Sequence, residues 1–442
     1  MTDLTILGGG PAGLGLAFYA HRAGRSFTLY ERSNALGGMC RTLTHGGHRY
    51  DTGAHRFHDR DKEVTGDLRA LMGAQLVPVR APSAVWTRGR FVNFPPTPLN
   101  AMSSHGVRGA FRILFELLQA RLRPRAAVSF EDFACNRFGP TLARGLLLNY
   151  CEKLWGLPAA RLSPDIATRR LHGMTVRSLL VELFLPSRKT AHIDGEFLYP
   201  RRGYGEIAER LAAALPPQAL RLEREIVGFE LKGGSITALR FSTGPDAEVR
   251  GRVVSTLPVT VLARLLGDAL PAAARAAAGR LRFRRIRLVF LRLSQATVTE
   301  NASIYLPEPR WCVSRLYEPR NRSAEMAPAG ETALVAEVPC FEGDELDRMT
   351  DADLGDRVVH ELADIGLIHA ESVLERRHHL LPFAYPVYAL GYEEEMAVIA
   401  EGLAAISNLD TVGRAGGFVY SHLHDQLRFG KDYIAKLGRT VA

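Results

Sequence analysis

The sequence predicts an α/β fold in which a parallel-sheet domain, assembled from separated segments, carries an inserted mixed α+β domain. Residues 4–7 and 26–30 are short apolar runs typical of buried parallel strands, and an Ala- and Gly-rich helix is expected between them. Strand patterns return at 220–256, 286–293 and 332–338, and helical patterns cover 107–123, 140–155 and 166–184. Because 442 residues exceed what one hydrophobic core usually serves, we expect at least two lobes.

The order of these patterns suggests where the lobes begin and end. The parallel-sheet domain is expected to be discontinuous, built from residues 1–75, 199–262 and 386–442. A helical lobe is expected at 76–198 and a sheet-containing lobe at 263–385. The two inserted lobes would then hold the substrate, while the discontinuous domain would hold a nucleotide.

Composition limits the classes of protein. The formal net charge of +9 comes mainly from dispersed arginines with no nucleic-acid motif, so we expect an anionic or glycosidic small molecule rather than a nucleic acid. Five scattered cysteines predict neither a disulfide framework nor a metal site. There is no run of 18 apolar residues, so no membrane span is expected. The expected location is cytoplasmic, because the first strand begins at once, and a homo-oligomer is left open.

The segment 107–123 (VRGAFRILFELLQARLR) has helical periodicity, with Arg on one face and Leu, Ile and Phe on the other. A basic amphipathic helix of this kind can lie on a membrane surface. A helix packed on the second lobe is the interpretation that we prefer.

A dinucleotide clamp is predicted at the amino terminus. Gly8, Gly10 and Gly13 form a Gly-x-Gly-x-x-Gly motif between the first strand and the first helix. Such glycines provide a tight turn, close approach of backbone to a pyrophosphate, and close helix–strand packing. Glu31 ends the second strand, where an acid accepts hydrogen bonds from ribose hydroxyls. Strand, loop, helix, strand and acid in this order indicate a Rossmann-like domain.

The residues after Glu31 distinguish between cofactors. Gly37-Gly38-Met39-Cys40-Arg41-Thr42 resembles the GG-x-x-RT extension of the flavoprotein group that includes amine oxidases, protoporphyrinogen oxidases and UDP-galactopyranose mutases. The resemblance implies a GR2-type FAD domain with non-covalent FAD, and no second Gly-x-Gly-x-x-Gly is present for NAD(P)H. By the same resemblance, the FAD-binding residues include Gly37, Gly38, Arg41, His55, Val227 near the adenine, and Arg414 in the last glycine turn.

Several later segments resemble the UDP-galactopyranose mutase branch of this group. They are Gly53 with His55-Arg56-Phe57-His58, Phe94-Pro95 with Pro98-Leu99-Asn100, Asn149 to Gly156, Ser314 to Glu318, Pro382 with Tyr385-Pro386, and Tyr420. The resemblance implies ring isomerisation of a nucleotide sugar through N5 of a reduced flavin, without net redox change.

The same resemblance assigns roles to residues. Arg169 and Arg315 would bind the substrate diphosphate, and His58 would complete the catalytic set. Tyr150 and Trp155 would stack on a ring, and Tyr385 and Tyr420 would donate to phosphate oxygens. From the residues alone, either arginine could equally be structural, and Tyr150 and Trp155 could equally belong to the core.

The sequence also departs from the mutase pattern. Met102 replaces an expected histidine, residues 197–205 (FLYPRRGYG) resemble oxidase-like relatives, and Ser421 to Asp425 replace an acidic run. The alternative function is therefore an FAD-dependent oxidoreductase that passes hydride from a small organic substrate to the flavin. A flavin-binding redox sensor is a third, non-enzymatic alternative.

Overall fold

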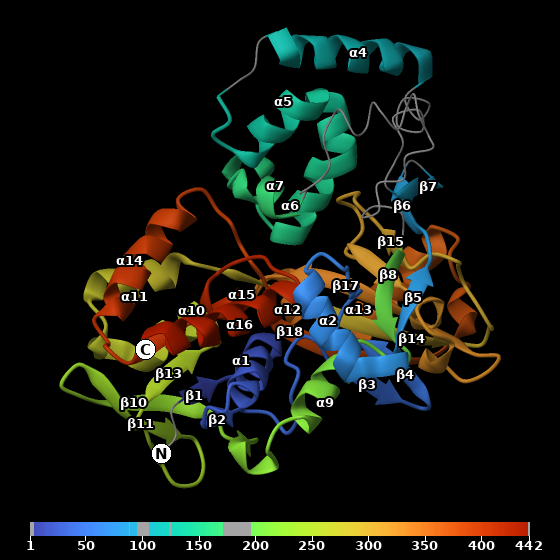
Figure 1. The fold of residues 1–442 in the computed structure, drawn as a ribbon. Helices are drawn as coiled ribbons and strands as arrows, with labels where there is room; N and C mark the ends of the chain where they lie inside the picture. Colours follow the sequence, from blue (N-terminus) through green and yellow to red (C-terminus); the bar gives the residue numbers. More distant parts are fainter. Residues whose placement is uncertain (1–3, 88, 95–105, 123–125, 171–195, 441–442) are drawn as a thin grey trace.

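The computed structural model describes residues 4–87, 89–94, 106–122, 126–170 and 196–440. At the centre of the nucleotide-binding side is a parallel sheet with strand order β19-β13-β1-β2-β9 (Figure 1). Its five strands come from three segments that are distant in the sequence. The strands are β1 (Leu4–Leu7), β2 (Phe27–Tyr30), β9 (Leu220–Arg221), β13 (Arg252–Ser255) and β19 (Leu409–Thr411). The expected α/β class, and the expected pair of parallel strands around the first helix, are confirmed.

Glycines set the helix packing on this sheet. α1 (Pro11–Arg22) crosses α16 (Leu423–Thr440), the last helix of the chain. A Cβ on Gly430 would lie 2.6 Å from the backbone of Gly15, so only glycine allows this close crossing. The contact joins the first fifty residues to the last thirty.

A seven-stranded sheet forms the second layer, with strand order β18-β14-β17-β16-β15-β6-β7. Its strands are β6 (Ser83–Thr87), β7 (Arg90–Phe94), β14 (Phe283–Leu293), β15 (Ser303–Tyr305), β16 (Arg315–Tyr317), β17 (Thr332–Cys340) and β18 (Val373–Pro386). One face packs on α13 (Asp351–Asp364), and the other faces Tyr50 and Ala54, at and just beyond the end of β4 (His48–Asp51). The active-site residues described below lie on this second face.

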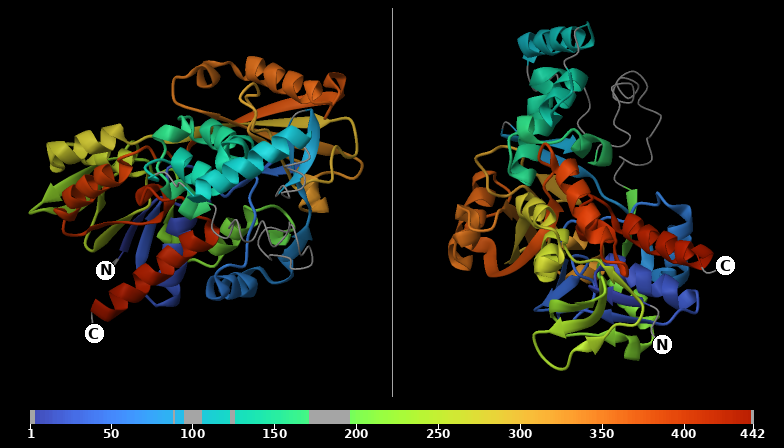
Figure 2. Two further views of the ribbon diagram at one scale, coloured as in Figure 1. Left: turned by 90° about the horizontal axis from the view of Figure 1, so that it is seen from above. Right: turned by 90° about the vertical axis from the view of Figure 1, so that its left-hand side faces the viewer.

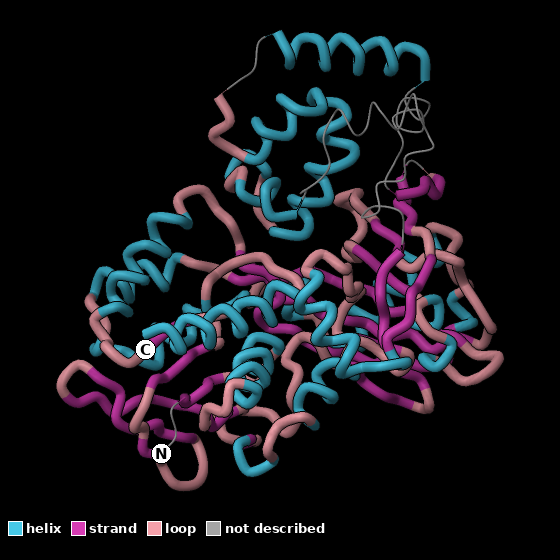
Figure 3. The backbone as a smooth tube through the Cα atoms, viewed as in Figure 1, coloured by secondary structure: helices cyan, strands magenta, loops and turns pink. Residues whose placement is uncertain are grey.

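The expected boundary of the helical lobe differs from the structure. Residues 83–94, which we expected in that lobe, form β6 and β7, because β6 pairs with β15 and with β7 at the edge of the seven-stranded sheet. The helices of the lobe follow β7, and Figures 1 and 3 show them standing above the two sheets. They are α4 (Gly106–Leu122), α5 (Phe130–Ala143), α6 (Asn149–Trp155) and α7 (Asp165–Arg170).

Smaller elements connect these layers. Strand pairs and a three-stranded sheet are formed by β3 (Thr42–His45) with β4, β5 (Leu76–Arg80) with β8 (Glu196–Pro200), and β10 (Ile226–Lys232), β11 (Ser235–Phe241) and β12 (Ala247–Glu248). The remaining longer helices are α2 (Lys62–Met72), α9 (Glu206–Ala213), α10 (Val259–Leu266), α11 (Ala272–Arg280) and α14 (Tyr392–Ala404). Short helical segments are α12 (Glu345–Arg348) and α15 (Gly413–Gly416).

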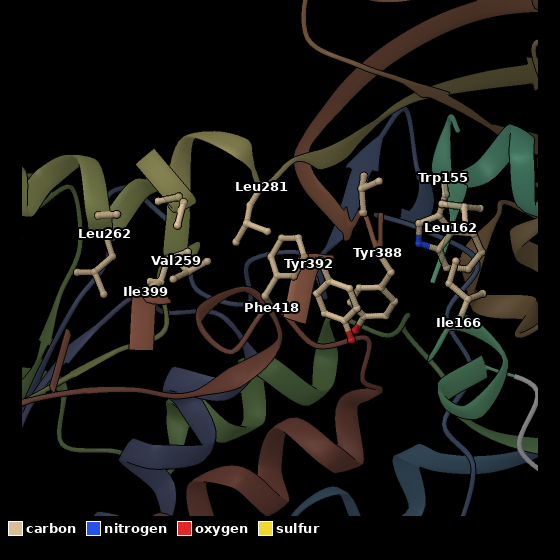
Figure 4. Packing of buried hydrophobic residues seen from close by; sticks show 14 of the residues in the cluster. Trp155, Leu162, Ile166, Val259, Leu262, Leu281, Tyr388, Tyr392, Ile399 and Phe418 are labelled. Carbon is tan, nitrogen blue, oxygen red and sulfur yellow. The ribbon is translucent and has the colours of Figure 1, made fainter. Parts of the chain in front are cut away.

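The largest hydrophobic cluster ties the helical lobe to the nucleotide-binding side. Trp155 and Leu162 from the helical lobe lie in the same cluster as Tyr388, Tyr392 and Phe418 (Figure 4). Tyr388 and Tyr392 stack with ring centroids 4.5 Å apart, which fixes the loop after β18. Across the described ranges, no helix combines the length and apolar character needed to cross a membrane.

Candidate active site

The predicted dinucleotide clamp forms a compact loop. Gly8 has φ +99°, and a Cβ on Gly13 would lie only 1.9 Å from the carbonyl oxygen of Gly8. A Cβ on Gly10 would meet nothing nearer than the Cα of Gly38, at 3.9 Å. Gly8 and Gly13 are therefore required by the protein itself, whereas Gly10 leaves space beside the start of α1. Among the described residues no side chain caps this helix, so its first N–H groups point to that space.

Glu31 holds the clamp from the end of β2. Its Oε2 accepts from the backbone N of Gly9 (2.8 Å), and its Oε1 accepts from the backbone N and the hydroxyl of Ser33 (2.9 and 2.8 Å). The backbone N of Arg224 donates to the Glu31 carbonyl, so the start of β10 approaches the same place. Val227 lies in this strand with a half-exposed side chain.

Two further glycine segments meet the clamp. The backbone N of Gly37 donates to the carbonyl of Gly9 (2.8 Å), and Gly38 has φ +51°. From the other end of the chain, Gly413 has φ +93°, and a Cβ there would lie 2.6 Å from the Cβ of Ala12. The segment of Arg41 continues from Gly38, and its carbonyl accepts from the backbone N of Thr52 (2.9 Å). Three separated glycine turns thus form one cradle of backbone, which fits a pyrophosphate.

The segment 53–58 leads from this cradle toward the seven-stranded sheet. The His55 ring stacks on Tyr204 (4.8 Å), and its Nε2 donates to the carbonyl of Met39 (2.9 Å). Burial, together with the nearby Arg315, lowers the pKa of His55 to about 3. The imidazole is therefore neutral at pH 7, with its second nitrogen available as an acceptor. His58 lies half-buried three residues further on.

Cross-strand register places Arg315 in a row of polar side chains. Tyr305 on β15, Arg315 on β16 and Glu337 on β17 are successive partners across the sheet. Arg315 donates from Nε (2.9 Å) and Nη2 (2.7 Å) to Glu337. Burial opposes the charge of Arg315, but Glu337 and the neighbouring tyrosines hold its pKa well above its usual value. Arg315 is thus fixed and charged, but its charge is compensated.

Three further tyrosines, Tyr150, Tyr385 and Tyr420, lie near this row. The Tyr150 ring from α6 meets the Tyr305 ring edge-on (5.4 Å), and the Tyr385 and Tyr420 rings are parallel (6.1 Å). The guanidinium of Arg414 lies 5.0 Å from the centroid of Tyr385 and 4.7 Å from that of Tyr420. Its Nη atoms donate to the carbonyls of Ser421 and Ala384, so its direction is fixed. Four residues that the sequence singled out separately are thus brought close to one another.

Trp155 is placed differently from the expectation that it stacks on a substrate ring. It is buried in the hydrophobic cluster, and its indole nitrogen donates to the carbonyl of Pro386 (3.2 Å). Its ring centroid lies 6.3 Å from that of Tyr385. Trp155 is therefore a core residue that packs near Tyr385, in agreement with the alternative that it belongs to the core.

Two arginines that the sequence analysis did not single out approach the same region. Nη2 of Arg56 donates to the hydroxyls of Ser83 (2.6 Å) and Ser303 (3.2 Å), and Nη2 of Arg322 donates to Ser303 as well (3.2 Å). Within the described part of the chain, neither has a carboxylate within ion-pair distance, and Nε and Nη1 of the buried Arg322 have no hydrogen-bond partner. Burial, with Arg322 and Arg315 nearby, lowers the pKa of Arg56 to about 10, so it stays charged at pH 7.

His422 lies in the segment Ser421 to Asp425, which departs from the mutase pattern. Its ring meets Tyr420 edge-on (5.5 Å) and stacks on His424 (5.7 Å). Burial, with Arg60 nearby, lowers the pKa of His422 to about 3. A neutral imidazole therefore replaces the acidic side chains expected at this place.

Some predicted positions fall outside the described residues. Residues 95–105, which include Met102 and the segment Pro98-Leu99-Asn100, are among them. Arg169 lies in the last turn of α7, and its side chain is not described. In the described ranges, no group of three or more His, Cys, Asp or Glu side chains could hold a metal ion.

Comparison with known proteins identifies the family. Residues 11–397 match the model of the family described as flavin containing amine oxidoreductase. The chain belongs to this family. The protein is therefore a flavoenzyme with FAD as its cofactor, which the glycine cradle and Glu31 fit, and the flavoprotein group expected from Gly37 to Thr42 is confirmed.

Solved structures share the fold over nearly the whole chain. A reduced UDP-galactopyranose mutase superposes with a TM-score of 0.85 at 20% identity, over 99% of this chain and 96% of that one. A proposed protoporphyrinogen oxidase from Exiguobacterium sp. 255-15 gives 0.74 at 20% identity, over 99% and 98%. A putrescine oxidase bound to putrescine gives 0.69 at 17% identity, over 99% and 98%. At these identities the likeness concerns the fold alone.

One curated relative matches a short region. The mitochondrial dihydrolipoyl dehydrogenase of Pisum sativum is 35% identical over 82 residues, which are 16% of this chain and 16% of that protein. The match spans only this small share of the relative's length, so the relative's activity is not carried over to this chain.

Proposed function

We propose that this flavoenzyme acts on an anionic, glycosyl-bearing substrate by a mutase-like ring isomerisation with the flavin reduced. The observation that carries the proposal is the charge of the site. Arg56, Arg315, Arg322 and Arg414 lie around it, and His55 is perturbed by three of them. Among the described residues, the carboxylates that oppose them are Glu337, which is paired with Arg315, and the buried Asp51, whose pKa burial raises. The described charged side chains around the site therefore carry a net positive charge.

This balance disfavours a protonated amine. An uncompensated charge at about 6 Å contributes roughly 3 kcal/mol at an effective dielectric constant of about 20. Two such charges, about 6 kcal/mol together, would weaken the binding of an ammonium group by about ten-thousandfold and would favour a phosphate by a comparable factor. The site is therefore better suited to a phosphate-bearing substrate than to an amine.

The side chains of the site would have two roles, which are attraction of the phosphate and positioning of the sugar. Arg56 and Arg414 would attract the phosphate oxygens, and Arg315, held by Glu337, would present a fixed charge beside Tyr305. Tyr150, Tyr385 and Tyr420 would enclose the sugar and donate to oxygens. Arg169 remains part of the proposal as a second phosphate ligand from α7, and His58 as a residue beside the cofactor. Bound FAD, when reduced, would supply the nucleophile of the reaction, so no side-chain nucleophile would be required.

A mass-neutral conversion tests the proposal. FAD-loaded enzyme reduced with dithionite, with oxygen excluded, is incubated with a panel of nucleotide sugars, and products are separated by chromatography and mass spectrometry. We expect a ring isomer of unchanged mass and a flavin that stays reduced. Turnover only with oxidised flavin, with one acceptor consumed per product, would show that the mutase-like proposal is wrong.

An FAD-dependent oxidoreductase is the second candidate. The parallel rings of Tyr385 and Tyr420, with centroids 6.1 Å apart, favour it, because an apolar amine or alcohol would pack against their aromatic faces. The family description points in the same direction. Bleaching of oxidised flavin by a substrate without added reductant would identify this activity.

A further inference from the structure

Helix α4 presents an apolar face to solvent. Large side chains at i, i+3, i+4, i+7 and i+11 are more than half exposed, namely Phe111 (71%), Leu114 (61%), Phe115 (66%), Leu118 (57%) and Leu122 (72%). With 3.6 residues per turn, this spacing places all five on one side of the helix. Scattered exposed apolar residues are ordinary, but a continuous stripe along a helix marks an interaction surface.

The opposite side of α4 attaches it to the protein. Ile113 and Glu116 are buried against α5. Glu116 accepts from the backbone N (2.7 Å) and hydroxyl (2.9 Å) of Thr141, beside the kink at Gly139. The helix therefore packs on the second lobe, as we expected, but not through its main apolar stripe. The stripe faces outward, away from α5.

Basic side chains border the stripe. Arg108 and Arg121 are exposed, and Arg112 is 72% exposed while its Nε donates to Glu116 (2.8 Å). Helical geometry puts Arg108 and Arg112 along one edge of the stripe and Arg121 along the other. Glu116 is the acidic residue of α4, and it faces inward. The outward surface thus combines an apolar centre with positive edges.

The position of α4 leaves this surface accessible to a flat partner. Figure 1 and the right-hand view of Figure 2 show α4 at the end of the helical lobe that lies farthest from the parallel sheet. Both views show the long axis of the helix lying across the top of the lobe rather than along its side. A planar surface can therefore meet the whole length of the stripe.

We propose that α4 docks the enzyme on the surface of an anionic lipid bilayer. A helix lying in the interface buries its apolar face at the boundary of headgroups and acyl chains, while arginines at its edges meet anionic headgroups. A second copy of the chain is the competing occupant. In a two-fold pair of α4 helices, the arginine edges would face like charges, and the outward surface of α4 offers no carboxylate to match them. Charge complementarity therefore favours the lipid surface. The proposal does not depend on the reaction that the enzyme catalyses.

Vesicle binding tests this proposal on the full-length, FAD-loaded enzyme. Sedimentation with vesicles of phosphatidylcholine containing phosphatidylglycerol should carry the enzyme into the pellet, and pure phosphatidylcholine should carry much less. The variant Phe115→Asp/Leu118→Asp should bind the anionic vesicles at least about tenfold more weakly, because it loses two inserted side chains and adds two negative charges. Leu118→Trp should keep binding, and its fluorescence should shift to the blue on addition of vesicles.

A matched variant and a size measurement complete the test. Leu374→Asp/Val398→Asp changes two exposed apolar residues on other elements by the same charge, and it should bind vesicles like the unaltered enzyme. Light scattering after size-exclusion chromatography measures the mass in solution. If the unaltered enzyme does not bind anionic vesicles, or if the matched variant loses binding as strongly as the α4 variant, the proposal is wrong. If the α4 variant only converts a dimer into a monomer, the stripe is an interface between copies instead.

Discussion

The cofactor side and the substrate side of this enzyme are built in different ways. The glycine cradle, which fits a pyrophosphate, is made of backbone, from turns at Gly8, Gly38 and Gly413 whose positive φ values are local properties of the chain. The substrate side is made of side chains whose neighbours are set by strand register, as in the row Tyr305, Arg315 and Glu337. A glycine of the cradle is required for its own backbone geometry. The position and charge of an arginine on the substrate side depend instead on the residue opposite it on the next strand.

This difference explains which residues the sequence could identify. The glycine spacing and Glu31 fall within thirty residues, so one motif predicts the clamp and its cofactor. Arg315 was identified through its segment, but its partner Glu337 is on another strand, and no local pattern joins the two.

The largest effect is expected at Gly10. Gly10→Val should fold but retain no FAD, because its side chain would enter the space beside the start of α1 without meeting the protein itself. Gly13→Ala should instead fail to fold, since its Cβ would lie 1.9 Å from the carbonyl oxygen of Gly8. Circular dichroism and the flavin released on denaturation distinguish the two losses. The exposed helical Gly66→Ala, where a Cβ would meet nothing within 4 Å, is the control and should change neither quantity.

Arg315→Ala should lower stability as well as activity. It leaves the carboxylate of Glu337 buried without its cation, and breaking a buried pair of this kind costs about 3–5 kcal/mol. The double variant Arg315→Met/Glu337→Gln should recover part of that loss, since no buried charge remains. Chemical unfolding of the three proteins provides the measurement. Unchanged stability in Arg315→Ala would show that the pair is not formed in solution.

Arg56→Met should weaken anion binding with little effect on folding or FAD content. Arg56 has two serine hydroxyls and no carboxylate as partners in the described residues, so its removal leaves no buried charge behind. Loss of one charge-assisted contact of about 1.5–3 kcal/mol corresponds to roughly tenfold to hundredfold weaker binding of inorganic pyrophosphate. The exposed Arg80→Met serves as the control. Equal pyrophosphate affinity in Arg56→Met and the unaltered enzyme would remove Arg56 from the site.

The smallest effect concerns acid stability. The pKa of His422 is lowered to about 3 by burial, with Arg60 nearby, whereas an unfolded histidine titrates near its ordinary value of about 6.5. Between these values the unfolded chain binds a proton that the folded chain does not, so stability falls as the pH falls. His422→Gln should reduce the fall by at most about 1.4 kcal/mol per pH unit. Urea unfolding of the FAD-loaded unaltered enzyme and variant at pH 7 and pH 5 measures the fall in stability. An equal fall in the two proteins would contradict the buried, neutral imidazole.

The limits of sequence prediction follow the same contrast. The strands at 4–7 and 26–30 and the helix between them were predictable, because apolar periodicity and glycine turns encode them locally. The strands at 83–94 were not predicted, since short alternating runs next to a long helical pattern carry a weak signal. Arg56 was visible inside a quoted motif but was passed over for its neighbouring histidines. Arg56 is distinguished by its hydrogen bonds to Ser83 and Ser303, which lie opposite each other on β6 and β15. Only the strand register brings these two serines together.

The central claim is that the site around Arg56, Arg315 and Arg322 receives an anion. The direct measurement is a pair of titrations of the oxidised, FAD-loaded enzyme, one with inorganic pyrophosphate and one with putrescine, each followed by the flavin absorption spectrum. We expect pyrophosphate to shift the spectrum in a saturable way and putrescine to leave the flavin oxidised and unshifted. Bleaching of the flavin by putrescine, with no response to pyrophosphate, would contradict the claim and place this enzyme with the amine oxidases in its chemistry.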